Sequence, residues 1–234
     1  MIYECRTHMG RVRASNQDTV LFYPQNGLFG VADGMGGHNG GDTASSMAAD
    51  IVLRSLKDAQ PSKDLLRLAI EFANREIYRK QLTETELSGM GTTFTALWKK
   101  DQQFIIAHVG DSRAYLLRKK SLRQVTEDHS LVAEMVKKGS ITANEARTNP
   151  YRNIITRAVG TDTRIDVDLF EADLQKGDRW LICSDGLNEH VDDDTIRAIL
   201  VEHNLKDAAD QLLNTALENG GSDNISIVLV EVDK

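Results

Sequence analysis

Four aspartates stand beside the most apolar segments of this 234-residue chain. Asp33 in VADG, Asp111 in HVGDSR and Asp185 in ICSDG each follow a strand-like run, and Asp223 in GGSDNIS precedes the last one. Asp-Gly and Gly-Ser-Asp-Asn are also common turn sequences, so a turn role is the simpler explanation for any single one. That explanation weakens for four such acids together, because strand ends in a layered sheet can bring distant residues to one edge.

Carboxylates gathered at one edge repel each other unless a cation lies between them. The set contains only oxygen ligands, and the six histidines do not pair at metal-ligand spacing. This chemistry favours Mg²⁺ or Mn²⁺ over Zn²⁺. Gly34, directly after Asp33, lacks a side chain and would let its backbone carbonyl approach an ion or its bound water. The sequence therefore predicts a divalent-metal site.

The glycine-rich segment 34–41 does not fit the two common nucleotide-binding loops. A dinucleotide fingerprint starting at Gly34 needs a glycine at position 39, where the chain has Asn39. A P-loop starting at Gly36 needs lysine where the chain has Asp42, an acid that would repel phosphates. Nucleotide binding by this loop is not expected.

The elements that must position these acids follow from periodicity. Helical spacing predicts helices over residues 44–56 with Asp42 as N-cap, 65–73 after Pro61 and Ser62, 128–138 closed by Gly139, 194–202 and 206–218. Strand-like runs are LFGVA (28–32), TTFTALW (92–98), QFIIAHVG (103–110), AYLLRK (114–119), DRWLICS (178–184) and NISIVLVEV (224–232). Strands in runs and helices in pairs predict an α+β layered fold. Residues 139–156 show no clear pattern and are predicted to form a flap or lid.

Composition excludes several classes of protein. With 28 basic and 35 acidic side chains the net charge is −7, which argues against nucleic-acid binding. No apolar stretch approaches a membrane span, and the N-terminus lacks the apolar core of a signal peptide. Cys183 lies in the apolar run WLICSDG and is interpreted as a core residue, because no arginine follows that could hold a phosphate. We expect a cytoplasmic protein of one domain.

Eight motifs, in order along nearly the whole chain, resemble the protein phosphatase 2C family of metal-dependent serine/threonine phosphatases in its compact bacterial form. They are RASNQD (13–18), VADGMGGHNGG (31–41), GMGTT (89–93), HVGDSRAYLLR (108–118), TEDHS (126–130), ITRAVGTD (155–162), ICSDGL (182–187) and GGSDNIS (220–226).

The resemblance implies a four-layer αββα sandwich of two antiparallel sheets between helix pairs, as one catalytic domain over residues 1–234. It also implies two Mn²⁺ or Mg²⁺ ions at one edge and room for a third. Asp33 would bridge both metals, Gly34 would offer its carbonyl, and Asp185 and Asp223 would complete the first metal. Asp111 matches the acid of the accessory third-metal site.

The same resemblance implies roles around the metals. Asp18 would hold metal-bound water and Arg13 would bind the substrate phosphate. His38 is a candidate general acid for the leaving alkoxide, with a purely structural role as the open alternative. Two positions depart from the family pattern: Gln17 stands where many members have glutamate, and Met35 where animal members have histidine.

The activity implied is hydrolysis of phosphoserine and phosphothreonine on proteins by a hydroxide that bridges the two metals. Phosphorylated proteins are the expected substrates and a cognate serine/threonine kinase the expected functional partner, with the enzyme acting as a monomer. The alternatives are a pseudophosphatase that binds phosphoproteins without turnover, and a phosphatase with one narrow client.

Overall fold

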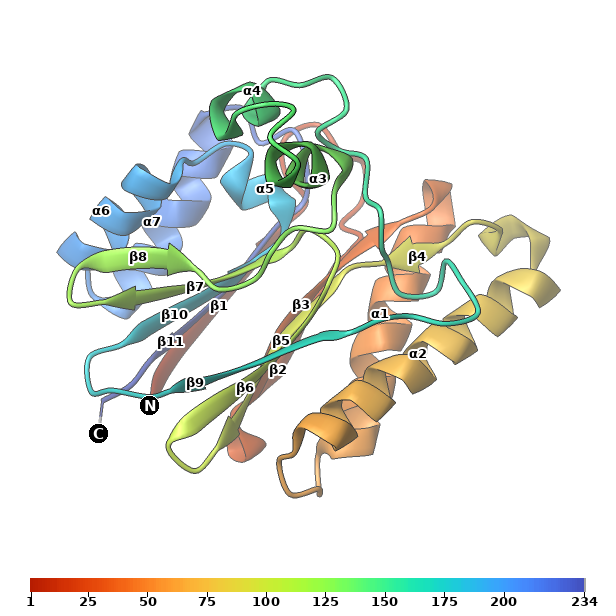
Figure 1. Cartoon of the computed structure of the whole chain (residues 1–234), viewed down its shortest axis with the longest axis horizontal. Coiled ribbons are helices and arrows are strands. Elements are labelled where there is room, and N and C mark those ends of the chain that lie inside the picture. Colours follow the sequence, from red (N-terminus) through yellow and green to blue (C-terminus); the bar gives the residue numbers. More distant parts are fainter. Residues whose placement is uncertain (234) are drawn as a thin grey trace.

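The computed structural model describes residues 1–233, without the side chains of residues 37–39. Over this part the chain forms two antiparallel sheets that face each other (Figure 1). The first has the order β1 (Ile2–His8), β11 (Ile225–Glu231), β10 (Arg179–Cys183), β7 (Arg113–Arg118) and β8 (Ser121–Gln124). The second has the order β2 (Asp18–Tyr23), β3 (Leu28–Met35), β5 (Phe94–Lys100), β6 (Gln103–Val109) and β9 (Asp168–Asp173), and β4 (Gly91–Thr92) pairs with β3.

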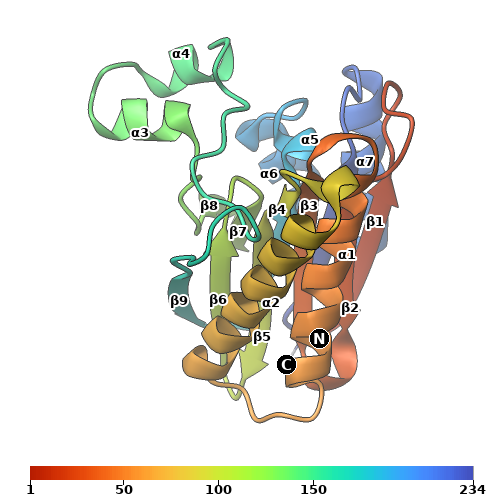
Figure 2. The same ribbon diagram turned by 90° about the vertical axis from the view of Figure 1, so that its right-hand side faces the viewer.

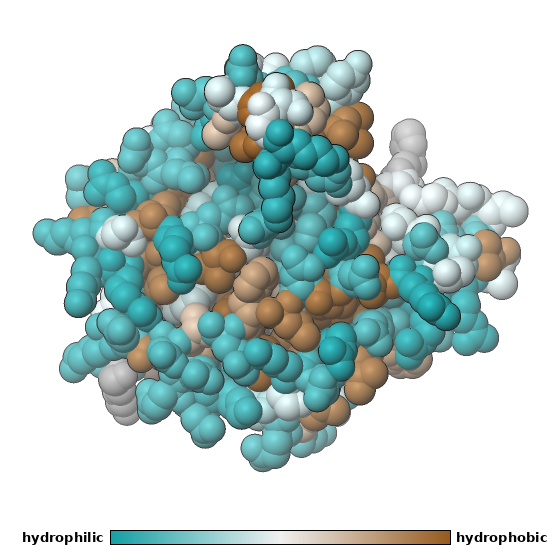
Figure 3. Space-filling model, viewed as in Figure 1, coloured by the Kyte–Doolittle hydropathy of each residue, from teal (hydrophilic) through white to brown (hydrophobic). Residues whose placement is uncertain are grey.

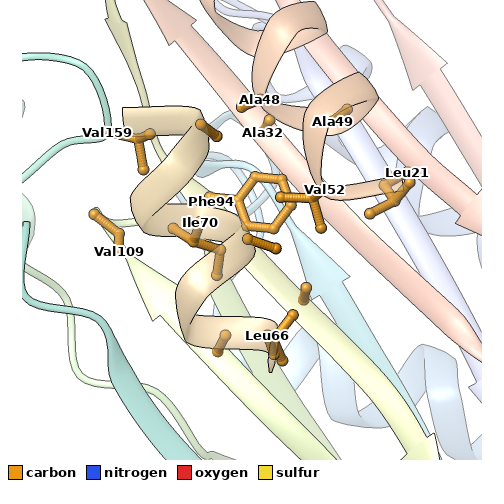
Figure 4. Close-up of a cluster of buried hydrophobic side chains, with 14 of the residues drawn as sticks. Leu21, Ala32, Ala48, Ala49, Val52, Leu66, Ile70, Phe94, Val109 and Val159 are labelled. Carbon is orange, nitrogen blue, oxygen red and sulfur yellow. The ribbon is translucent and has the colours of Figure 1, made fainter. Parts of the chain in front are cut away.

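Helix pairs cover the outer faces of the two sheets. Helices α1 (Gly37–Leu56) and α2 (Lys63–Thr83) cover the second sheet, and α6 (Asp193–Glu202) and α7 (Leu205–Glu218) cover the first (Figure 1). In Figure 4, Val52 of α1, Ile70 of α2 and Phe94 of β5 meet in one of these helix-to-sheet layers. This arrangement confirms the four-layer αββα fold expected from the sequence.

The run WLIC in β10 is continuously apolar because the sandwich buries both of its faces. Trp180 and Ile182 point between the sheets, while Leu181 and Cys183 point toward α6 and α7. Successive side chains of a strand alternate in this way, so each residue of the run enters a different core layer. Cys183 is therefore a core residue, as interpreted from the sequence.

The predicted start of the first helix was wrong. Asp42 is not its N-cap: α1 begins at Gly37, after Gly36, whose φ of +125° favours glycine. The first turn packs directly on β3, where a Cβ at Gly34 would lie 2.0 Å from the carbonyl oxygen of Gly41. Tertiary packing thus overrides the weak helix propensity of the glycines.

The other helix predictions were closer to the structure. Ser62 caps α2 by accepting a hydrogen bond from the Leu65 amide at 3.2 Å, and α6 and α7 begin one residue before the predicted ranges. The third helix was predicted too long. As α3 (Leu131–Lys137) it starts after Ser130, whose hydroxyl accepts from the Ala133 amide.

Residues 139–156 contain a short helix, α4 (Ala143–Arg147), where no regular structure was predicted. A capping box stabilises it: Thr142 Oγ1 accepts from the Glu145 amide, and the Glu145 carboxylate accepts from the Thr142 amide. Figure 2 shows α3 and α4 standing out from the sandwich as a separate projection, called the flap below. A bridge between Ser130 and Ile155 closes its base.

Candidate metal centre

The fold brings the predicted acids together at one edge of the sandwich. The antiparallel register of β2 and β3 sets Asp18 opposite Asp33. Asp185 begins the short helix α5 (Asp185–Asn188) after β10, and Asp111 lies in the loop between β6 and β7. The charges of Asp18, Asp185 and Asp111 all act on Asp33. Strand ends therefore do gather these distant acids, as the sequence predicted.

Burial and mutual repulsion raise the pKa values of this cluster. Burial is the main cause for Asp33, whose pKa lies well above its usual range, with Asp18, Asp185 and Asp111 adding repulsion. The pKa of Asp185 is raised in the same way, by burial and then by Asp111. Burial raises the pKa of Asp18 to about 6 and, together with the charge of Asp128, that of Asp111 to about 7. Bound protons or cations are needed to offset the repulsion within such a cluster.

Three buried oxygens of the cluster lack a hydrogen-bond partner within the described part of the chain. They are the Oδ1 atoms of Asp18, Asp111 and Asp185. Buried carboxylate oxygens without a hydrogen-bond partner are suitable ligands for a hard divalent cation. No three acidic, imidazole or thiol groups among the described residues converge on a single point. Water and backbone carbonyls would therefore have to complete each coordination shell, which Mg²⁺ in particular tolerates.

The GMGTT segment holds Asp33 in place through its backbone. The Asp33 amide donates to Thr93 Oγ1 at 3.0 Å, and its carbonyl accepts from Thr92 Oγ1 at 2.9 Å and from the Thr93 amide at 2.8 Å. Thr93 Oγ1 also lies 2.7 Å from Ser112 Oγ, next to Asp111. One threonine thus links strand β3, which carries Asp33, to the loop that carries Asp111.

Arg13 lies at the mouth of the cluster. Its Nη2 donates to Asp223 Oδ2 at 2.5 Å, and its side chain remains half exposed. The Asp223 hydrogen bond raises the pKa of Arg13 most, and the charges of Asp185 and Asp33 raise it further. The guanidinium predicted to bind phosphate is therefore beside the acids, paired with one of them.

The loop that carries Arg13 is fixed by Asn224, a residue that the sequence analysis did not single out. Its buried side-chain amide donates to the Met9 and Ser15 carbonyls at 3.0 and 2.9 Å and accepts from the Gln17 amide at 2.8 Å. All of these partners lie more than 200 positions earlier in the chain. The only available signal was the position of Asn224 directly after Asp223 in GGSDNIS.

Ser184 orients Asp18 and was also missed. Its hydroxyl donates to Asp18 Oδ2 at 2.7 Å and accepts from the Ser226 amide at 2.9 Å. While Oδ2 is held in this way, Oδ1 of Asp18 is buried and has no hydrogen-bond partner among the described residues. The cue in the sequence was the serine immediately before Asp185 in ICSDG.

Gly34 and His38 are the two other predicted site residues. Gly34 is required by packing, because any side chain would collide with the backbone of Gly41 and Gln17. The reason given from the sequence, room for an ion or water, is therefore not needed to explain this glycine. The side chain of His38 lies outside the described residues.

The geometry agrees with comparisons to known proteins. Residues 7–229 match the family model described as "Protein phosphatase 2C". The chain belongs to the protein phosphatase 2C family. It is 40% identical to the serine/threonine phosphatase stp of Listeria monocytogenes, across 98% of this chain and 95% of that protein.

Solved structures of the family are also similar. The Mycobacterium tuberculosis serine/threonine phosphatase PstP/Ppp superposes with a TM-score of 0.93 at 37% identity, covering 100% of this chain and 99% of that one. The catalytic domain of the phosphatase PstP in complex with two manganese ions gives 0.90 at 36% identity, covering 100% and 98%. Among the described residues of the present chain, no helix is long and apolar enough to cross a membrane.

Proposed function

We propose that this chain is a metal-dependent phosphatase that hydrolyses phosphoserine and phosphothreonine on proteins. The observation that carries the proposal is the group of acids at one edge, with three buried carboxylate oxygens that lack a hydrogen-bond partner among the described residues. Membership of a family whose named relatives are serine/threonine phosphatases supports it. No acid of the predicted set is missing, so nothing favours a pseudophosphatase.

In this proposal Asp33, Asp185, Asp223 and the Gly34 carbonyl would hold two divalent cations, Mn²⁺ or Mg²⁺, and Asp111 would hold an accessory third. When bound, such cations neutralise the phosphoryl oxygens and lower the pKa of a water molecule beside them. The manganese ions of the PstP catalytic domain support this assignment. The raised pKa values of Asp33 and Asp185 support it too, because bound cations would offset the burial and mutual repulsion of these acids.

The remaining steps belong to side chains of the chain itself. Asp18, held by Ser184 through Oδ2, accepts a hydrogen bond from the attacking water through Oδ1. Arg13 turns from Asp223 to the substrate phosphate, to which its planar fork can donate two charge-assisted hydrogen bonds. Exposure of half the Arg13 side chain leaves room for this exchange.

The setting proposed is a single catalytic domain over residues 1–234 that acts as a monomer in the cytoplasm. Its substrates are phosphorylated proteins, and a serine/threonine kinase supplies them. The flap helps to select these substrates, because it forms one wall of the cleft that leads to Asp111 and Asp185.

The direct test is turnover by the purified chain in Mn²⁺. We expect hydrolysis of p-nitrophenyl phosphate and of phosphothreonine peptides, measured as phosphate release. Absence of turnover on every phosphopeptide, with the protein folded and Mn²⁺ bound, would contradict the proposal.

His38 is proposed as the general acid that protonates the leaving serine or threonine oxygen. Since nitrophenolate leaves without a proton, His38→Ala is expected to slow phosphopeptide hydrolysis by at least about 10²-fold and to slow nitrophenyl phosphate hydrolysis little. For the peptide alone, the pH profile should lose the fall in rate at high pH that deprotonation of a general acid causes. Equal slowing of both substrates would instead assign His38 to phosphate positioning, and no slowing would leave it a structural role.

A further inference from the structure

A cleft of about 700 Å³ runs from the metal centre to the flap. Asp111 and Asp185 line its inner end, and residues of α3 and α4 line its outer wall. Figures 1 and 2 both show these two helices standing apart from the sheets above this edge. A peptide whose phosphorylated residue reached the acids would therefore run along this cleft.

The sheet side of the cleft carries charges that are already paired. Arg113 makes a two-pronged contact with Asp128, with its Nη2 at 2.6 Å from Oδ2 and its Nε at 2.9 Å from Oδ1. Arg157 Nη1 lies 2.6 Å from Asp168 Oδ1. Each guanidinium would have to break its ion pair with Asp128 or Asp168 before it could bind a substrate anion.

The flap side is paired in the same way. Its ion pairs are Lys137 with Glu127 at 2.6 Å, Lys138 with Glu134 at 3.4 Å and Arg152 with Glu189 at 3.6 Å. The acids of the cleft beyond the metal centre are thus matched by cations. In Figure 3 the flap, at the top of the molecule, shows hydrophobic and intermediate residues mixed with hydrophilic ones, and hydrophilic residues lie directly below it.

Arg147 is the exception among the described residues that line the cleft. It ends α4 and is exposed, and its side chain has neither a hydrogen bond nor an ion pair with any described residue. The acid on which its charge acts is Asp192, whose pKa is lowered mainly by hydrogen bonds from Thr195 and to a smaller degree by Arg147. Asp192 already caps α6, accepting from the Thr195 amide at 2.8 Å. Arg147 therefore adds one uncompensated positive charge to the cleft wall.

We infer that Arg147 binds an anionic side chain of the substrate, close in sequence to the phosphorylated residue held at the metal centre. The inference rests on the proposed phosphatase function and names the class of substrate that the enzyme prefers: acidic or multiply phosphorylated segments. Carboxylate and phosphate both fit a guanidinium fork, and a second phosphate carries more charge. Peptides that carry one or the other distinguish these two sources.

The test uses phosphothreonine peptides in which one neighbouring position at a time is Gln, Asp, phosphoserine or Lys. For each enzyme the measured quantity is the kcat/KM ratio of the charged peptide to the Gln peptide, in Mn²⁺. For the wild type we expect a ratio of about three for Asp at one or two positions, as for an exposed ion pair. Phosphoserine should give a larger ratio, and added salt should lower both.

Variants assign the preference to one side chain. Arg147→Ala should bring the ratios to about one, and Arg147→Glu should favour the Lys peptide at the same positions. Arg147→Lys, which keeps the charge and loses the fork, should give an intermediate ratio. The matched control is Arg54→Ala on α1, an exposed arginine paired with Asp50 away from the cleft, which should keep the wild-type ratios.

The outcomes separate this inference from the function on which it rests. If the wild type hydrolyses the peptides but shows no anionic preference at any position, or if Arg147→Ala keeps that preference, the role of Arg147 is wrong and the phosphatase proposal stands. If no peptide is hydrolysed at all, both are overturned.

Discussion

Treatment with a chelator is expected to abolish hydrolysis of p-nitrophenyl phosphate and phosphothreonine peptides, and Mn²⁺ or Mg²⁺ is expected to restore it. The reason is that the arginines near the acids, Arg13 and Arg113, are each already paired with a carboxylate, so charge neutralisation of the phosphoryl group depends on bound cations. Activity that persists after the metal content has been measured as zero would contradict the two-metal proposal.

The same experiment has a readout that does not depend on activity, because the cluster couples cation binding to pH. Asp18 and Asp111 keep protons up to pH values of about 6 and 7 in the folded chain, whereas an unfolded chain releases them near pH 4. Between these limits the folded state binds more protons, so stability of the metal-free protein falls as pH rises. Cations replace those protons and reverse the trend.

Thermal unfolding should therefore show a small effect of Mn²⁺ near pH 5 and a much larger one near pH 7.5. The chelated protein should have the lower Tm at the higher pH. A Mn²⁺ effect that is the same at both pH values would argue that the buried acids are not where the ion binds.

The sequence analysis selected Asp33, Asp111 and Asp185 because each follows an apolar strand-like run, and the structure places each of them near or just after the end of a strand. A strand buried on both faces, such as WLIC in β10, has a short and continuously apolar sequence. An acid that follows such a sequence marks the end of the strand and therefore the edge of the sheet. Asp18 could not be found in this way, because β2 (DTVLFY) has half-buried positions and begins with the acid itself. It was identified by resemblance alone.

The features that the sequence did not predict depend on contacts between distant parts of the chain. β1, with the sequence IYECRTH, has no apolar pattern of its own and is defined by its pairing with β11, about 220 positions later. The hydrogen bonds of Asn224 to residues 9–17 and the packing of Gly34 on Gly41 are likewise tertiary. In contrast, the capping box of α4 was visible as TANE and could have been predicted.

Asp33→Asn and Asp185→Asn are each expected to lower turnover by about 10²- to 10³-fold, similar to the cost of removing one group that stabilises the charge of a transition state electrostatically. Each change keeps the shape of the side chain and removes a charge from a cluster in which the acids repel one another. The metal-free variants should therefore unfold at the same temperature as the wild type or a higher one near pH 7.5, while the stabilisation by Mn²⁺ should be lost.

This combination separates loss of a metal ligand from simple damage to the fold, which would lower the metal-free Tm as well. Asp50→Asn, which changes an exposed acid of α1, is the matched control and should change neither turnover nor the Mn²⁺ effect.

Asp111→Ala should differ both from the control and from the Asp33 and Asp185 variants. Turnover should fall while Mn²⁺ still stabilises the protein, because Asp33 and Asp185 keep their own ions. Unchanged turnover in Asp111→Ala would reduce that acid to a turn residue, and unchanged turnover in Asp33→Asn would place the active site elsewhere.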